Sequence, residues 1–348
     1  MNKYFVLALV LIAFCISAVC DATAQTIIKN GGAKTFGKQP AVVEEAVKLE
    51  TSVGNLYGTL LLPRSKKKVP VVLIIAGSGP TDRNGNSPLL KGSNNSLKLL
   101  AEGLAAQGIA SLRYDKRGIG ESGKEMFLAA QKTNKMPREE DLSFDNFIDD
   151  AVLWGQKLRD DKRFSGVTIA GHSEGSLIGM VAAQKIKADA FISIAGAGRP
   201  IGQILLEQLK SQLSPDLMKS AEDILSQLAV GETVESVPTA LQIVFRPSVQ
   251  PYMISWLRLD PAKEIARLTI PVLITQGTTD IQATMQDVKL LAAANPSAKV
   301  SLIEEMNHVL KAVTNDRDKQ VASYSDPTLP VVPELVSEIS RFIHKAKK

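Results

Sequence analysis

Ser173 lies where a predicted strand meets a predicted helix. Its segment, GHSEG at 171–175, follows a strand expected at 167–170 and precedes a helix expected at 176–186. In that context G-x-S-x-G is typical of a nucleophile elbow, a tight turn that projects the serine Oγ above a sheet. Glycine removes Cβ atoms that would clash in the turn, and the N-terminus of the next helix favours developing negative charge. Without that context the segment predicts only a glycine-rich turn before an ordinary helix.

A serine nucleophile needs a general base, and the candidates are the three histidines of the chain. His172 adjoins Ser173 on the same turn, so its side chain is expected to point elsewhere. His344 lies in the last predicted helix, beside a lysine-rich tail. His308 follows a strand predicted at 299–303. A lone histidine is more often structural than catalytic, but elimination and position favour His308 as the base.

The base in turn needs a carboxylate that orients it. Asp280 follows a strand predicted at 271–276. Because the carboxyl ends of parallel strands share one edge of a sheet, Ser173, Asp280 and His308 can meet at that edge. Each residue alone has a structural explanation, but together they predict a catalytic triad.

The elements that must position these residues alternate between strands and helices. The strand predicted at 69–76 has no polar alternation, which is typical of a strand buried on both faces of a parallel sheet. A hairpin is expected before it, at 42–49 and 56–62, with a turn cluster at 51–55. The alternation predicts an α/β fold with a mostly parallel sheet and helices on both faces. Its further strands are expected at 109–114, 167–170, 190–195, 271–276 and 299–303, and its helices at 96–107, 144–158, 176–186, 282–294 and 332–344.

The alternation stops between residues 198 and 256. Short amphipathic helices are expected there at 204–213 and 221–228, and residues 246–252 have a loop-like composition. This stretch predicts an insertion rather than an independent domain.

Two loops carry a resemblance to a known family. Residues 113–122, RYDKRGIGES, are similar to a D-x-R-G-x-G-x-S loop, and residues 75–85, IAGSGPTDRNG, to a G-S-G-P-x-D-R-x-G loop. With the elbow and the triad order Ser, Asp, His, the chain resembles an α/β-hydrolase of the bacterial carboxylesterase, lysophospholipase and serine-aminopeptidase-like (S33-like) group. The resemblance runs from about Val42 to the C-terminal helix. Many relatives have His-Gly at the start of the second loop, where this chain has Ala76-Gly77.

The resemblance implies an α/β-hydrolase core at 41–197 and 257–348, with the insertion at 198–256 forming a helical cap over the active site. An acyl-transfer site also needs two backbone N–H groups that bind the developing oxyanion. One is expected from Glu174, the residue after the nucleophile. The other is expected from the loop after the strand at 69–76, at Ser78 first and Gly79 next.

Other chemistries fit the sequence less well. There is no H-E-x-x-H, and three scattered histidines argue against a metal site. Asp82 occupies the place of the third glycine of a dinucleotide fingerprint, and no Walker A sequence is present. With 41 basic and 36 acidic residues, the net charge of +5 is too small to indicate a nucleic-acid partner. We therefore expect no cofactor, and a small-molecule ester as the partner.

The N-terminus predicts export. Lys3 precedes an apolar run at 4–19, and an A-x-A pattern ends at Ala24, which together indicate a signal peptide at 1–24. The run is shorter than the ~20 residues that span a bilayer, and an uncleaved anchor is the alternative. A polar linker is expected at 25–40. The mature protein is then periplasmic or secreted, without stable insertion in a membrane.

Both cysteines of the chain, Cys15 and Cys20, lie inside this leader. The mature protein is therefore expected to have no disulfide, no thiol nucleophile and no cysteine-ligated metal. A lipoprotein would be anchored through Cys20, but Val19 is a poor residue before a lipidated cysteine.

These residues predict an exported serine hydrolase that cleaves carboxylic esters through an acyl-enzyme. A peptidase or thioesterase with the same triad is the alternative within this class, because the triad fixes acyl transfer and not the leaving group. A third interpretation is an envelope binding protein that kept the fold and lost activity. The intact set Ser173, Asp280 and His308 argues against it.

Overall fold

A mixed sheet lies at the centre of the described chain. The computed structural model describes residues 42–51, 54–133 and 138–346, so the predicted signal peptide and linker lie outside the described residues. Within these ranges eight strands follow the order β1-β2-β4-β3-β5-β6-β7-β8. β2 pairs antiparallel with β1 and β4, and all later neighbours pair in parallel, which confirms the mostly parallel sheet. The strands are β1 (Val42–Thr51), β2 (Gly54–Pro63), β3 (Val69–Ile75), β4 (Ala110–Tyr114), β5 (Phe164–His172), β6 (Ala190–Ile194), β7 (Val272–Gly277) and β8 (Lys299–Ile303).

The predicted hairpin is formed by β1 and β2, and both strands run further than expected. Thr51 pairs with Gly54 and Glu50 with Asn55, in the range where the composition favours a turn. Ladder hydrogen bonds satisfy backbone groups at these positions, and this outweighs the weak strand preference of glycine and asparagine.

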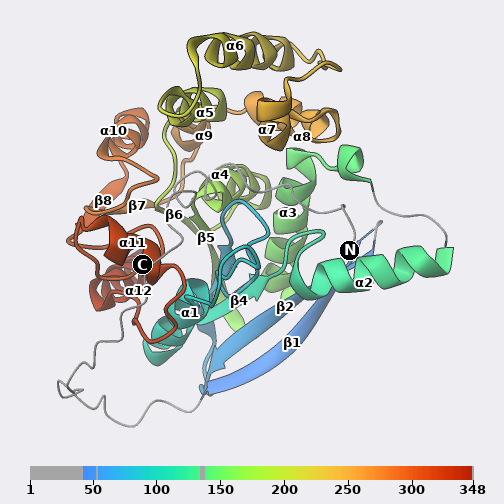
Figure 1. The fold of residues 1–348 in the computed structure, drawn as a ribbon. Helices are drawn as coiled ribbons and strands as arrows, with labels where there is room; N and C mark the ends of the chain where they lie inside the picture. The colour runs from blue at the N-terminus through green and yellow to red at the C-terminus, as the bar shows by residue number, and fades with distance from the viewer. Residues whose placement is uncertain (1–41, 52–53, 134–137, 347–348) are drawn as a thin grey trace, which may run out of the picture.

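The sheet is covered on both faces, as the unbroken apolar sequence of β3 predicts. Successive side chains of a strand point to opposite faces. Val71, Leu73 and Ile75 pack with α3 (Phe144–Asp160) and α4 (Glu174–Ile186). Val72 and Ile74 pack with α1 (Ser96–Ala106) and α12 (Pro333–Ala346). All four helices confirm expected ones, and they can be followed in Figure 1.

Several helices are not predicted from the sequence. α2 (Gly120–Thr133) begins inside the stretch at 113–122, which the family resemblance predicts to be a loop. The short helices α9 (Pro261–Ala266) and α11 (Arg317–Ser323) are also unexpected, whereas α10 (Met285–Ala294) confirms the helix predicted at 282–294. No helix in the described ranges has the length and apolar character needed to span a membrane.

The 198–256 segment contains helices on one side of the molecule (Figure 1). α5 (Ile201–Lys210) and α6 (Pro215–Ala229) correspond to the two amphipathic helices expected there. The loop expected at 246–252 is wrong over most of its length, because Pro247–Val249 form a short 3-10 helix and α8 begins at Gln250. Pro251 occupies the first turn of α8, where a missing backbone N–H costs no helical hydrogen bond. The segment holds α5, α6, α7 (Gln242–Phe245) and most of α8 (Gln250–Leu257), and its role as a cap stays a prediction.

Candidate active site

Ser173 occupies a strained turn between β5 and α4. Its φ of 55° and ψ of −123° lie in a region that L-residues rarely adopt. Such conformations cost about 1–3 kcal/mol and persist only where the surrounding structure enforces them. The Ser173 N–H donates to the Ile194 carbonyl at 2.9 Å, which ties the turn to the end of β6.

The two glycines of the elbow are required by close backbone approach. A Cβ on Gly171 would lie 2.0 Å from the Gly175 carbonyl oxygen, and a Cβ on Gly175 would lie 2.4 Å from the Ile75 carbonyl oxygen. Real Cβ atoms do not come this close to backbone. The glycine spacing therefore lets α4 begin directly against β5 and the end of β3.

Asp280 and His308 form a buried pair after β7 and β8. The distance from His308 Nδ1 to Asp280 Oδ2 is 2.8 Å, and both side chains are nearly inaccessible. Asp280 Oδ2 also accepts from Gln276 Nε2 at 3.0 Å. Oδ1 accepts from the backbone N–H groups of Gln282 and Ala283. Because a carboxylate only accepts, His308 Nδ1 is the donor, which leaves Nε2 free to accept a proton.

The three predicted triad residues come together at one edge of the sheet. Ser173 and His308 line the same cavity of about 40 Å³, and Asp280 holds the His308 ring from behind. Within the described chain no hydrogen bond joins Ser173 Oγ to the His308 ring. Such bonds are often long before substrate binds and tighten in the reacting complex.

Both predicted oxyanion donors are available. Among the described residues, neither the Ser78 nor the Glu174 backbone N–H donates a hydrogen bond. Ser78 lines the 40 Å³ cavity together with Ser173, and Glu174 opens α4 directly after the serine. An N–H at the first turn of a helix has no intrahelical partner, so it can bind an anion at no structural cost.

His172 has a role that the sequence does not reveal. Its Nε2–H donates to the backbone carbonyl of His308 at 2.8 Å, and the two rings lie 4.8 Å apart. Burial, helped by the neighbouring His308, lowers the pKa of His172 to about 3. The ring is therefore neutral at pH 7 and secures the loop that carries His308. His172 lines the same cavity as Ser173 and His308, and its ring hydrogen belongs to the His308 carbonyl rather than to Ser173.

This burial predicts a pH dependence of stability. Between pH 6.5 and about 3 the unfolded chain carries a proton on His172 that the folded chain does not. The free energy of unfolding should therefore fall as the pH falls through this window, by up to about 1.4 kcal/mol per pH unit from this site. His172→Gln should lessen the loss, measured by urea unfolding at several pH values. The control is His344→Gln, at an exposed position, and equal slopes in wild type and His172→Gln would contradict the assignment.

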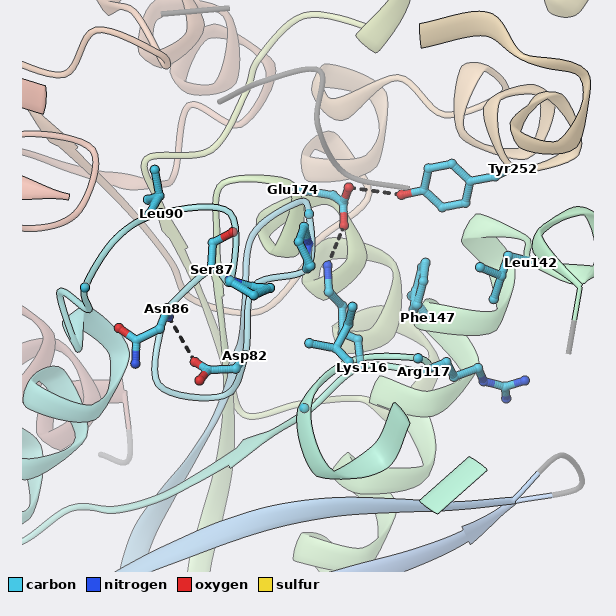
Figure 2. Close-up of a pocket in the computed structure, with 17 residues that line it drawn as sticks. Asp82, Asn86, Ser87, Leu90, Lys116, Arg117, Leu142, Phe147, Glu174 and Tyr252 are labelled. Carbon is cyan, nitrogen blue, oxygen red and sulfur yellow. Dashed lines mark hydrogen bonds and ion pairs between the residues drawn. The ribbon is translucent and has the colours of Figure 1, made fainter. Parts of the chain in front are cut away.

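A second cavity, of about 510 Å³, adjoins the first one. Ser87 and Leu90 line both cavities, so the two are neighbours. Figure 2 shows Lys116, Glu174 and Tyr252 linked at its wall, with Phe147 beside them. Glu174 is expected here for its amide, but its buried side chain and its two partners are not foreseen, because nothing in sequence spacing brings 116, 174 and 252 together.

Similarity to known proteins agrees with this geometry. The sequence profile of the family described as serine aminopeptidase, S33 matches residues 92–318. The chain is 28% identical over 264 residues to the esterase EstD of Thermotoga maritima, an alignment that covers 75% of this chain. The chain spans 59% of the length of that curated relative.

Solved structures share the fold. Est1E of Butyrivibrio proteoclasticus, with ferulic acid bound, is similar at a TM-score of 0.55 and 16% identity, over 86% of this chain and 99% of that one. The proline iminopeptidase of Mycobacterium smegmatis is similar at a TM-score of 0.52 and 12% identity, over 87% of this chain and 99% of that one. The expected α/β-hydrolase fold is thereby confirmed. Since the family profile covers more than half of the chain and includes Ser173, Asp280 and His308, the protein belongs to the serine aminopeptidase S33 family of serine hydrolases.

Proposed function

We propose that this protein is a serine esterase that hydrolyses carboxylic esters through an acyl-enzyme. The observation that carries the proposal is the 2.8 Å contact between His308 Nδ1 and Asp280 Oδ2, with the His308 ring and Ser173 on one cavity. A serine in a strained elbow beside an imidazole oriented by a carboxylate is the arrangement that activates a hydroxyl as a nucleophile.

The reaction would run in two halves. Ser173 Oγ attacks the ester carbonyl while His308 Nε2 takes its proton, and Asp280 stabilises the imidazolium that forms. The Ser78 and Glu174 amides hold the oxyanion of the tetrahedral intermediate. The C–O bond of the ester then breaks, and His308 returns the proton to the leaving alcohol. In the second half His308 takes a proton from water, the hydroxyl attacks the acyl-enzyme, and Ser173 Oγ leaves with the proton from His308.

The names of two similar proteins favour an ester substrate over an amide. EstD of Thermotoga maritima is named an esterase, and Est1E of Butyrivibrio proteoclasticus is described with ferulic acid bound. The family description names a serine aminopeptidase, so an amide substrate is the competing outcome. The 510 Å³ cavity next to the one that holds Ser173 and His308 has room for an acyl or alcohol group of moderate size.

We also propose export to the periplasm or the exterior after removal of residues 1–24. Support comes from the sequence alone, namely Lys3, the apolar run at 4–19 and the A-x-A pattern. The mature protein would act on a small-molecule ester without nucleic acid or a stable membrane-inserted part.

A substrate panel tests the proposed activity on protein that lacks residues 1–24. The panel pairs short p-nitrophenyl acyl esters with acyl thioesters and aminoacyl p-nitroanilides, and a fluorophosphonate probe reports the nucleophile. We expect Ser173-dependent labelling and the highest kcat/KM for the esters. A clear preference for the anilides would replace the esterase by a peptidase. A folded protein that is unlabelled and inactive on every substrate would favour a binding protein instead.

A further inference from the structure

Lys116 is a buried cation at the edge of the active site. It lies in the turn after β4, and its side chain is 4% exposed. Its Nζ donates to the Gly77 carbonyl oxygen at 2.7 Å and to Glu174 Oε1 at 2.9 Å. The Phe147 ring centroid lies 5.3 Å from the same nitrogen. An ammonium in such a dry environment holds its partners more firmly than an exposed one.

The first partner belongs to the peptide that carries one oxyanion donor. The Gly77 carbonyl and the Ser78 N–H are the two ends of one planar peptide group, and the described chain has no cis peptide bond. In a trans peptide the C=O and N–H point in opposite directions, so Lys116 directs the Ser78 N–H away from itself. A charge-assisted bond to the carbonyl also polarises the peptide, which makes the N–H a better donor.

The second partner carries the other oxyanion donor. The backbone N–H of Glu174 is the predicted donor at the start of α4, and the side chain of the same residue accepts from Lys116. Its other oxygen, Oε2, accepts from the Tyr252 hydroxyl at 3.0 Å. Burial, together with the nearby Glu174 charge, raises the pKa of Tyr252 well above its ordinary value, so this hydroxyl keeps the proton that it donates.

We infer that Lys116 is the positioning residue of the oxyanion hole. One ammonium holds the Gly77–Ser78 peptide and the first residue of α4 together, and so sets the separation and direction of the two N–H groups. Tyr252 on α8 completes the network from the 198–256 segment. This inference rests on the proposed function, because an oxyanion forms only if Ser173 attacks a carbonyl or an equivalent electrophile.

The test removes the ammonium without leaving a buried charge behind. Lys116→Met alone would strand the Glu174 carboxylate, which destabilises a fold strongly. The comparison is therefore between Glu174→Gln, in which the ammonium keeps the Gly77 carbonyl and an amide oxygen as acceptors, and the double variant Lys116→Met/Glu174→Gln, which buries neither charge. We expect the double variant to have a kcat about 10- to 100-fold below that of Glu174→Gln, with KM within threefold, since loss of a whole oxyanion donor costs about 10²–10³-fold. Affinity for phenylboronic acid, whose serine adduct is tetrahedral, should fall in parallel.

A matched control removes another buried ion pair. Arg199 Nε lies 2.9 Å from Asp287 Oδ1, outside both cavities. Arg199→Met/Asp287→Asn should lower the melting temperature but keep kcat within threefold of wild type. If Lys116→Met/Glu174→Gln does not fold, Lys116→Gln/Glu174→Gln keeps a polar pair while its shorter side chain cannot reach the Gly77 carbonyl, and the same fall in kcat is expected.

Two results would overturn the inference. One is a kcat of the double variant within threefold of Glu174→Gln. The other is a rise in KM at unchanged kcat, which would make Lys116 a group that binds the substrate ground state. Failure of the proposed function is separate from both, because it would appear as a wild-type protein that neither reacts with fluorophosphonate nor hydrolyses any substrate of the panel.

Discussion

Replacing Ser173 by alanine is expected to lower kcat/KM for ester hydrolysis by roughly 10⁴- to 10⁶-fold while the protein stays folded. Alanine keeps the Cβ that the turn already accommodates and removes only the attacking oxygen. The residual rate would come from the oxyanion donors and from substrate binding. Steady-state kinetics on a p-nitrophenyl ester, with the unfolding transition measured in parallel, gives both quantities.

A neighbouring serine provides the control for this variant. Ser176 lies on the first turn of α4, is buried, and bonds to Ser193 Oγ at 2.7 Å. Ser176→Ala should cost about 1 kcal/mol of stability for the lost hydrogen bond and leave kcat/KM within threefold. If Ser173→Ala retained more than a tenth of wild-type activity, the nucleophile would have to be another group.

Replacing Asp280 by asparagine is expected to lower kcat by about 10⁴-fold, because it places His308 in the wrong tautomer. Two backbone N–H groups, of Gln282 and Ala283, converge on Oδ1. In the variant the amide oxygen must face these donors, so the amide NH₂ faces the His308 ring. His308 Nδ1 then accepts and Nε2 carries the hydrogen, which prevents Nε2 from taking the proton of Ser173. Steady-state kcat for the p-nitrophenyl ester, compared with wild type, checks the size of the loss.

The Asp280→Asn variant also changes a second contact, because its amide NH₂ would face Gln276 Nε2, which donates to Oδ2 in the wild type. Asparagine has nearly the same volume, so the buried pocket is not emptied, but two donors that face each other cost stability and the melting temperature should fall. Asp316→Asn is the control for the substitution itself, because Asp316 caps α11 at an exposed position. Activity of Asp280→Asn within tenfold of wild type would show that the ring keeps its tautomer without the carboxylate, and would remove Asp280 from the triad.

Most strands and helices could be predicted from patterns of apolar residues over short stretches of the sequence. The unbroken apolar run of β3 indicates a strand buried on both faces, and the structure places it between β4 and β5. The helices at α1, α3 and α4 follow from apolar spacing, a signal that depends only on nearby residues. Residues with low helix propensity obscure two helices in the sequence: α2 begins at Gly120, and the first turn of α8 contains Pro251.

The candidate triad could be predicted because each of its members follows a strand. Parallel strands bring their carboxyl ends to one edge, so residues 173, 280 and 308 converge however far apart they lie in the chain. The Lys116–Glu174–Tyr252 network follows no such rule. Its members come from a turn, a helix start and the 198–256 segment, and only the packing of that segment brings Tyr252 to Glu174.

The sequence by itself therefore determined the alternation of elements, the edge at which chemistry can occur and the residue types that gather there. The reason is that periodicity and the direction of parallel strands are properties of the chain alone. Tertiary structure decided how the reacting groups are held: the hydrogen bond from His172 to the loop of His308, the four donors around Asp280, and the ammonium of Lys116 between two peptide segments. These contacts require the distances between remote segments to be correct to within a few tenths of an ångström. Only the packing of the core fixes distances that closely.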